Sequence, residues 1–357
     1  MTRATRAEIN LSALRHNLQV ARSSSRAKQM AIIKADGYGH GIVEVAHALS
    51  DADGFGVATI NEAITLRESG VYQPILLLEG FNRPQDLLLM HAYHLESAIH
   101  NEEQIKIIET EASNPHRAWI KVDTGMHRLG FAPDQVSSVY QRLAAIESIQ
   151  QPIPLMTHFA CADDKNADYT KQQHALFEKA TAGFTKSETS LANSAGLLGW
   201  PETHADWVRP GIMLYGASPF VNGNAADHDL QPVMTLKSEI IAIHNFNKGD
   251  SIGYGQGYVC EADMPVATIA IGYGDGYPRH ACNGTPVLIN GQHAPLVGRV
   301  SMDMITVDLR TIKKAKVGDE VTLWGEGLPV ELVAEKAETI SYELFCGVTQ
   351  RVEFHYY

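Results

Sequence analysis

Short apolar segments alternate with helix-length amphipathic segments from the N-terminus to about residue 230. Helical spacing is seen, for example, in Leu11, Leu14, Leu18 and Ala21, with Asn10 as a candidate helix cap. This alternation is typical of a parallel sheet built from βαβ units, and seven or eight repeats predict a closed (β/α)8 barrel. The predicted strands cover residues 29–34, 54–59, 74–79, 94–99, 118–123, 154–159 and 189–194.

The pattern changes after Gln231. Long β-type runs such as VMTLKSEIIAIHNF, PVATIAIGY and DEVTLWG are separated by Lys-Gly-Asp and Asn-Gly turns. In this part, only residues 330–337 have the spacing of a helix. We therefore expect an α/β protein with a TIM-type barrel over residues 1–230, followed by a mostly antiparallel β domain over residues 231–357.

Composition excludes several classes of protein. No apolar run approaches the roughly 20 residues of a membrane span, and residues 1–14 lack the apolar core of a secretion signal, so we expect a cytoplasmic protein without a membrane partner. The net charge of -12 argues against nucleic acid as a partner. The cysteines form no CxxC pair, so neither metal binding through cysteine nor a disulfide framework is expected.

Lys34 closes the first predicted strand and is followed at once by the glycine-rich segment ADGYGHG. An amine at the end of a buried strand loses part of its water shell, which disfavours the ammonium form and permits Schiff-base formation with an aldehyde. The same local pattern is more often that of a lysine whose head group is solvated. However, Arg128, His158 and Ser194 also fall at predicted strand ends, where (β/α)8 barrels carry their active sites.

Glycines flank several of these polar residues. Beside Ser194, the backbone of Gly211 and Ile212 is a candidate anion site, because glycine lets a phosphate approach the amides closely. In the segment ANSAG, either Asn193 or Ser194 is also expected to cap a helix. Taken singly, Arg128 and Arg209 fit surface salt bridges equally well. A single histidine such as His158 is more often a structural residue than a catalytic one.

The order of these motifs resembles the alanine racemase family. The segments KADGYGHG, TGMHRLG, THFA, NSA, VRPGIMLYG, IGYGQGY, IGYGDGY, GRVSMDM and ISYE follow one another as in that family and cover essentially the whole chain. The resemblance implies an isomerase that interconverts L-alanine and D-alanine with pyridoxal 5'-phosphate and without a metal. It also implies a homodimer with shared active sites. D-alanine is a peptidoglycan precursor, but the sequence leaves open whether the enzyme serves synthesis or breakdown.

The resemblance assigns roles to individual residues. Lys34 would form the internal aldimine and act as one base, while Tyr254 of the neighbouring subunit would act as the second base on the opposite face. Arg209 would face the pyridine nitrogen and leave it unprotonated, because a guanidinium does not readily give up a proton. A weaker electron sink then favours racemisation over transamination. The other cofactor residues implied are Tyr38, His158, Ser194, Gly211, Ile212 and Tyr342.

The resemblance also implies a set of substrate contacts. Arg128 and the backbone amide of Met302 would hold the substrate carboxylate, while Tyr273 and Asp303 of the β domain would line the entrance and the substrate site. Lys121 matches a lysine that is carbamylated in many members. A carbamate would replace a cation by an anion and would orient Arg128.

Two other functions are compatible with parts of the sequence. A barrel-type amino-acid decarboxylase would place a carboxylate against the pyridine nitrogen, and Arg209 argues against it. A cofactor-handling pyridoxal-phosphate protein would have the barrel alone, and the residues after Gln231, with Tyr254 among them, argue against that.

Overall fold

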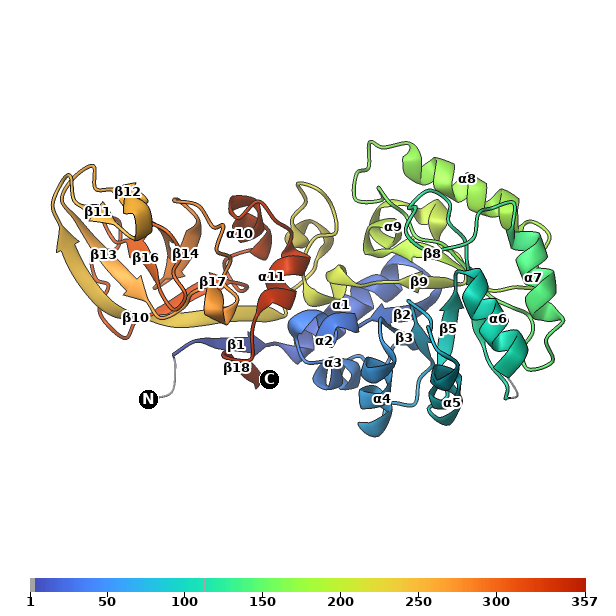
Figure 1. The fold of residues 1–357 in the computed structure, drawn as a ribbon. Helices are drawn as coiled ribbons and strands as arrows, with labels where there is room; N and C mark the ends of the chain where they lie inside the picture. Colours follow the sequence, from blue (N-terminus) through green and yellow to red (C-terminus); the bar gives the residue numbers. More distant parts are fainter. Residues whose placement is uncertain (1–3, 112–113) are drawn as a thin grey trace.

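The computed structural model describes residues 4–111 and 114–357. Figure 1 shows a barrel surrounded by helices beside an elongated sheet domain. Eight parallel strands close the barrel, and each pairs with its neighbours in sequence order. The fold class expected from the sequence is therefore confirmed. The barrel strands are β2 (Lys28–Ile32), β3 (Gly54–Val57), β4 (Ile75–Leu77), β5 (Glu96–Ile99), β6 (Ala118–Lys121), β7 (Leu155–Met156), β8 (Thr189–Asn193) and β9 (Trp207–Arg209).

Each segment expected to be a strand contains one, although the strands are shorter than predicted. Strand β9 was not predicted, because its three residues are too few to show a pattern. Most strand residues are buried, as in a parallel sheet that is covered on both faces. Strand β2 ends at Ile32, so Lys34 lies just beyond it rather than within it.

The helices of the barrel each bury one face. In α1 (Leu11–Ser24), Leu14, Leu18 and Ala21 are buried, and the Asn10 side chain accepts a hydrogen bond from the Ala13 N–H, which confirms the predicted cap. The longer helices that follow are α3 (Ile42–Ala48), α4 (Ile60–Glu68), α5 (Pro84–Ala92), α6 (Glu102–Glu111), α7 (Val136–Ala144) and α8 (Tyr169–Thr181). No helix in the described ranges combines the length and the apolar character needed to cross a membrane.

The second domain is built around the long strand β10 (Met234–Phe246). Its main sheet has the order β15-β14-β17-β10-β1-β18, and β13 and β16 extend it beside β10. The pairings are antiparallel except for β1 with β18. The remaining strands are β11 (Ser251–Ile252), β12 (Tyr258–Val259), β13 (Met264–Ile269), β14 (Pro286–Ile289), β15 (Gln292–Pro295), β16 (Ile305–Asp308), β17 (Glu320–Trp324) and β18 (Glu353–Tyr356).

Strand β1 (Arg6–Ile9) departs from the expected division of the chain near residue 230. It lies in the sheet of the second domain, between β10 and β18 (Figure 1). Ala7 and Ile9 are fully buried, while Glu8 faces outward and its carboxylate lies 2.9 Å from the Lys237 ammonium of β10. This strand was not predicted, because four residues of alternating polar and apolar character are too few to indicate a strand, and a strong helix pattern follows directly.

The second domain has two α-helices, which lie between β17 and β18 in the sequence. The expected helix over residues 330–337 is present as α10 (Val330–Lys336). The expectation that no other helix follows residue 231 was wrong, because α11 (Ser341–Gly347) is also present. It has no side-chain N-cap and buries only Ser341, Leu344 and Phe345, so its sequence carries little helical signal. This short helix packs against the segment that follows Lys34 and thereby joins the two domains at the mouth of the barrel.

Candidate active site

A cavity of about 450 Å³ opens at the carboxyl ends of the barrel strands. It brings together side chains from six different strand ends and one helix of the second domain, as expected for a barrel of this type. The residues proposed from the sequence that line it are Lys34, Tyr38, Lys121, Arg128, His158, Ser194, Arg209, Gly211, Ile212 and Tyr342.

The chain after Lys34 adopts a left-handed turn, α2 (Lys34–Gly39). Ala35, Asp36, Gly37 and Tyr38 have φ values of 52°, 53°, 61° and 52°. For residues other than glycine this conformation costs about 1–2 kcal/mol each, so other contacts must compensate for it. A carboxylate oxygen of Glu62 accepts a hydrogen bond from the Ala35 N–H at 2.7 Å.

The left-handed turn directs Tyr38 into the barrel mouth. Its ring is buried and stacks on Tyr215, with 4.6 Å between the ring centroids, and the ring of Tyr342 on α11 lies 5.8 Å away. Burial raises the pKa of the Tyr342 phenol to about 12, with a smaller contribution from the Asp163 carboxylate. Both phenols are therefore protonated at neutral pH and can donate hydrogen bonds. A Cβ atom on Gly39 would lie 2.2 Å from the carbonyl oxygen of Phe345, so only glycine fits between the turn and α11.

Hydroxyl and amide groups converge beside these tyrosines. The Ser194 hydroxyl, at the start of α9 (Ser194–Gly199), accepts a hydrogen bond from the Gly211 N–H at 2.8 Å. The Asn193 side chain accepts one from the Gly196 N–H, so the helix cap expected in this segment is Asn193. A Cβ atom on Gly211 would lie 2.8 Å from the Tyr38 hydroxyl oxygen. This set of neutral donors fits a phosphate group, which binds backbone amides and hydroxyls.

Arg209 lies at the end of β9 and is 3% exposed. Its guanidinium donates to Ser190 Oγ at 2.6 Å and to the carbonyl oxygens of Thr157 and Leu191 at 2.5 and 3.1 Å. His158 Nδ1 lies 3.3 Å from the same group. Burial lowers the pKa of Arg209 to about 10. The group therefore remains a cation at neutral pH, held entirely by neutral partners.

Several cations face this cavity together. The pKa of His158 is lowered well below its usual value, mainly by burial and to a smaller extent by the neighbouring Arg209 cation, so the imidazole is neutral. The pKa of Lys121 is lowered to about 8, mainly by burial and to a smaller extent by the neighbouring cations of Arg209, Arg128 and Lys34. A cavity with this excess of positive charge attracts anionic ligands, such as phosphates and carboxylates.

Of the residues proposed from the β domain, Tyr342 lines this cavity, but the other four do not reach it within the same chain. Tyr254 is 69% exposed, Met302 52% and Tyr273 41%. Asp303 forms an ion pair with Arg351 at 2.6 Å. None of these four residues lines the cavity around Lys34. The described chain therefore contains two separate groups of candidate residues, one at the barrel mouth and one on the surface of the β domain.

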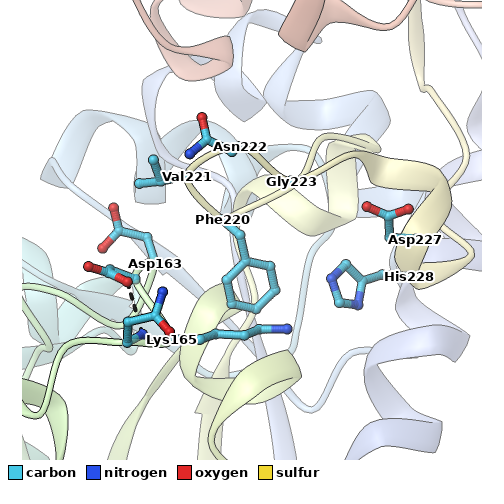
Figure 2. Close-up of a pocket in the computed structure, with 10 residues that line it drawn as sticks. Asp163, Lys165, Phe220, Val221, Asn222, Gly223, Asp227 and His228 are labelled. Carbon is cyan, nitrogen blue, oxygen red and sulfur yellow. Dashed lines mark hydrogen bonds between the residues drawn. The ribbon is translucent and has the colours of Figure 1, made fainter.

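Figure 2 shows a second cavity, of about 690 Å³, between the loop after β7 and residues 220–228. The Lys165 side chain extends beneath the Phe220 ring toward His228, with its ammonium nitrogen 4.1 Å from the ring centroid. Asp163 and Asp227 lie on either side of this aromatic contact. None of the proposed site residues lines this cavity, so its larger volume does not make it the better candidate.

Sequence reasoning missed some residues of the barrel-mouth cavity. Glu79 follows β4 and lines the cavity, and the strand-end rule applied to PILLLE could have identified it. Cys346 lines it too, but it belongs to α11, which was not predicted. Ser190 hydrogen-bonds Arg209 from the neighbouring strand, a contact that depends on strand register and leaves no local signal.

Comparison with known proteins agrees with this architecture. Residues 9–219 match the family model described as the alanine racemase N-terminal domain, and residues 233–356 match that of the C-terminal domain. The alanine racemases of Coxiella burnetii (strain RSA 331) and Aeromonas hydrophila are each 51% identical to this chain, with 99% of both chains covered. The structure resembles that of biosynthetic alanine racemase from Pseudomonas aeruginosa with a TM-score of 0.97, at 42% identity and 99% coverage of each chain. The alanine racemase of Acinetobacter baumannii has a TM-score of 0.93 at 36% identity, covering 99% of this chain and 100% of that one. Sequence and structure thus agree over the full length, and the chain belongs to the alanine racemase family of isomerases.

Proposed function

We propose that this chain interconverts L-alanine and D-alanine by a two-base mechanism that uses pyridoxal 5'-phosphate. The observation that carries the proposal is the arrangement of the barrel mouth. One cavity contains the half-buried amine of Lys34, the buried guanidinium of Arg209 and a set of neutral hydroxyl and amide groups. Family members from several bacteria are named alanine racemases, which supports the choice of substrate.

The cofactor would lie between these groups. Ser194, Tyr38, Tyr342 and the amides of Gly211 and Ile212 would hold its phosphate, because they are uncharged donors in a cavity with excess positive charge. When bound, pyridoxal phosphate supplies an aldehyde carbon for an amine and a conjugated ring that withdraws electrons from the substrate α-carbon.

Arg209 would set the protonation of the ring nitrogen. Its cation donates hydrogen bonds and does not release a proton at neutral pH, since its pKa is about 10. A nitrogen that faces such a donor accepts a hydrogen bond and stays unprotonated. The neutral His158 beside Arg209 adds no second charge. This arrangement favours the return of a proton to the α-carbon, and therefore racemisation over transamination.

Racemisation requires proton transfer on both faces of the α-carbon. Lys34 Nζ would remove or return the proton on one face, and Tyr254 Oη would serve the other. Because Tyr254 lies on the surface of the β domain and outside the cavity of its own chain, it would have to come from a second copy. We therefore propose a homodimer in which each site takes Lys34 from one subunit and Tyr254 from its partner.

The substrate carboxylate would be held by Arg128 at the barrel mouth and by the backbone amide of Met302. Arg128 lines the cavity, whereas Met302, Tyr273 and Asp303 are in the β domain and would approach from the second subunit. Lys121 lines the same cavity and has a pKa of about 8, so part of its amine is neutral and able to add to carbon dioxide near physiological pH. The resulting carbamate would supply an anion beside the cationic side chain of Arg128.

The proposal is tested by incubating the cofactor-loaded protein with L-alanine in deuterium oxide. Proton NMR and a chiral assay should show D-alanine forming, with deuterium replacing the α-proton. Formation of ethylamine would indicate decarboxylation, and loss of the amino group would indicate transamination. Either as the main reaction would contradict the proposal.

Shared active sites are tested by mixing two inactive variants. A heterodimer of Lys34→Ala and Tyr254→Phe contains one site in which both bases are native, but only if the two bases come from different subunits. Random reassortment should then restore about one quarter of the wild-type sites. If mass spectrometry shows that mixed dimers have formed and they have no activity, the proposal of shared active sites is refuted.

A further inference from the structure

The turn that carries Tyr254 has little support of its own. Residues 253–257 join β11 and β12, which are each only two residues long. Gly253, Gly255 and Gln256 have φ values of 77°, 65° and 52°, and Tyr254 itself is 69% exposed. The glycines at positions 253 and 255 permit the left-handed backbone but do not hold it in one conformation. The position of the Tyr254 phenol must therefore be fixed from outside the hairpin.

Asn283, in the loop before β14, connects this turn to another segment. Its side-chain amide nitrogen donates to the carbonyl oxygen of Gly257 at 2.9 Å. Its side-chain oxygen accepts a hydrogen bond from the Gly298 N–H at 2.7 Å. Because the donor and the acceptor are both engaged, the amide group has one preferred orientation. Within the described residues, this is the one side-chain hydrogen bond that reaches residues 253–257.

The segment on the other side of Asn283 forms a surface beneath the turn. A Cβ atom on Gly253 would lie 3.1 Å from the backbone nitrogen of Arg299, and one on Gly257 would lie 3.0 Å from Arg299 Cγ. Gly298 is buried, and a Cβ atom there would lie 3.1 Å from the carbonyl oxygen of Ile252. The turn thus rests against residues 298–299, and Asn283 ties the two backbones together.

We propose that Asn283 is a positioning residue for proton transfer by Tyr254. It touches no reacting atom, but it fixes the turn whose tyrosine would enter the site of the partner subunit. The inference rests on the proposed role of Tyr254 as the second base. Loss of the two Asn283 hydrogen bonds should therefore impair proton transfer on the face of the α-carbon that Tyr254 serves, and should leave transfer on the Lys34 face nearly unchanged.

The test measures the initial rate of α-proton exchange into deuterium oxide, separately from L-alanine and from D-alanine, with the cofactor-loaded dimer. Tyr254→Phe identifies the enantiomer whose exchange depends on the tyrosine. Asn283→Ala should slow exchange from that enantiomer by about tenfold or more and from the other by less than about twofold, because a small misplacement of a catalytic group is costly. Asn283→Asp keeps the acceptor for Gly298 and loses the donor to Gly257, so it should show the same one-sided loss.

A matched control separates positioning from stability. Asn290→Ala removes a hydrogen bond of 2.8 Å to Asp319 in the same domain, at the connection between β14 and β15. It should lower the thermal midpoint without a one-sided exchange defect. Equal losses for both enantiomers in the Asn283 variants, with a one-sided loss in Tyr254→Phe, would overturn the inference alone. Equal losses in Tyr254→Phe itself would overturn the second-base role and the inference with it. If Asn283→Ala does not fold, the exchange rates of Asn283→Asp from the two enantiomers test the inference in its place.

Discussion

Replacing Lys121 by methionine is expected to stabilise the cofactor-free protein near neutral pH. Lys121 is 8% exposed at the end of β6, and its neighbours include Arg209, Arg128 and Lys34. Folding therefore places its ammonium group in a site with little water and an excess of positive charge. Methionine keeps most of the aliphatic length and removes the charge, so the substitution tests the electrostatic cost with little change in packing.

The magnitude follows from the pKa of Lys121, which falls from 10.5 to about 8 on folding and so corresponds to about 3 kcal/mol. Between these values the unfolded chain binds more protons than the native one, so the stability of the wild type rises with pH across this window. Below pH 8 the whole cost is present. The advantage of Lys121→Met should thus be largest near pH 7 and should shrink as the pH rises from about 8 to 10.5.

Urea unfolding in bicarbonate-free buffer, followed by tryptophan fluorescence at several pH values, measures this difference. Lys106→Met is the matched control, because Lys106 is 57% exposed on α6, and its stability difference should be small with little pH dependence. A Lys121→Met protein that is less stable than the wild type at pH 7, or a stability difference that does not change with pH, would refute the reasoning.

Bicarbonate provides a second arm of the same experiment. Carbamylation joins the neutral amine nitrogen to the carbon of carbon dioxide and releases a proton, so a cation becomes an anion beside Arg128. Bicarbonate should then stabilise the wild type and leave Lys121→Met unchanged. A carbamate signal in carbon-13 NMR should appear only in the wild type, and its absence from the stabilised protein would count against the modification.

Three further outcomes are expected. Lys34→Ala should abolish both the borohydride-reducible lysine adduct with pyridoxal phosphate and nearly all activity; a reducible lysine adduct retained in the variant would exclude Lys34. Arg209→Glu should favour protonation of the ring nitrogen and raise side transamination, measured as pyruvate formed per racemisation event, and an unchanged ratio would contradict its electronic role. Gly39→Ala should lower the free energy of unfolding by about 2 kcal/mol or more, because its Cβ atom would lie 2.2 Å from the Phe345 carbonyl oxygen at a φ of +75°; a neutral effect in urea unfolding would show that α11 can move away.

The barrel was predictable from the sequence because its strands are neighbours in sequence order, so the alternation of strands and helices also gives the topology. The strand-end rule then predicts that Lys34, His158 and Ser194 lie at the same end of the barrel, and all three line one cavity. The prediction of these three residues depends on local patterns of apolar residues and glycines, which can be read directly from a single sequence.

Other parts depend on contacts between distant segments. Ala35 and Tyr38 adopt left-handed backbone conformations that their residue types disfavour, so no propensity predicts them; the Glu62 carboxylate from α4 helps to hold that turn. Helix α11 is stabilised by packing rather than by its own sequence. The neighbours of Arg209 are set by strand register, which the pattern of apolar residues does not specify.

The position of β1 has a consequence for how the molecule is made. The barrel strands pair with near neighbours and can assemble while the chain is being synthesised, but β1 pairs with β10 and β18, so its sheet is complete only after residue 356 has been synthesised. Until then the edge of β1 that pairs with β18 lacks its partner, and before β10 has been synthesised the other edge lacks its partner as well. Unpaired strand edges promote association between chains. The interval between completion of the barrel and arrival of β18 is therefore when nascent chains of this protein are most exposed to aggregation.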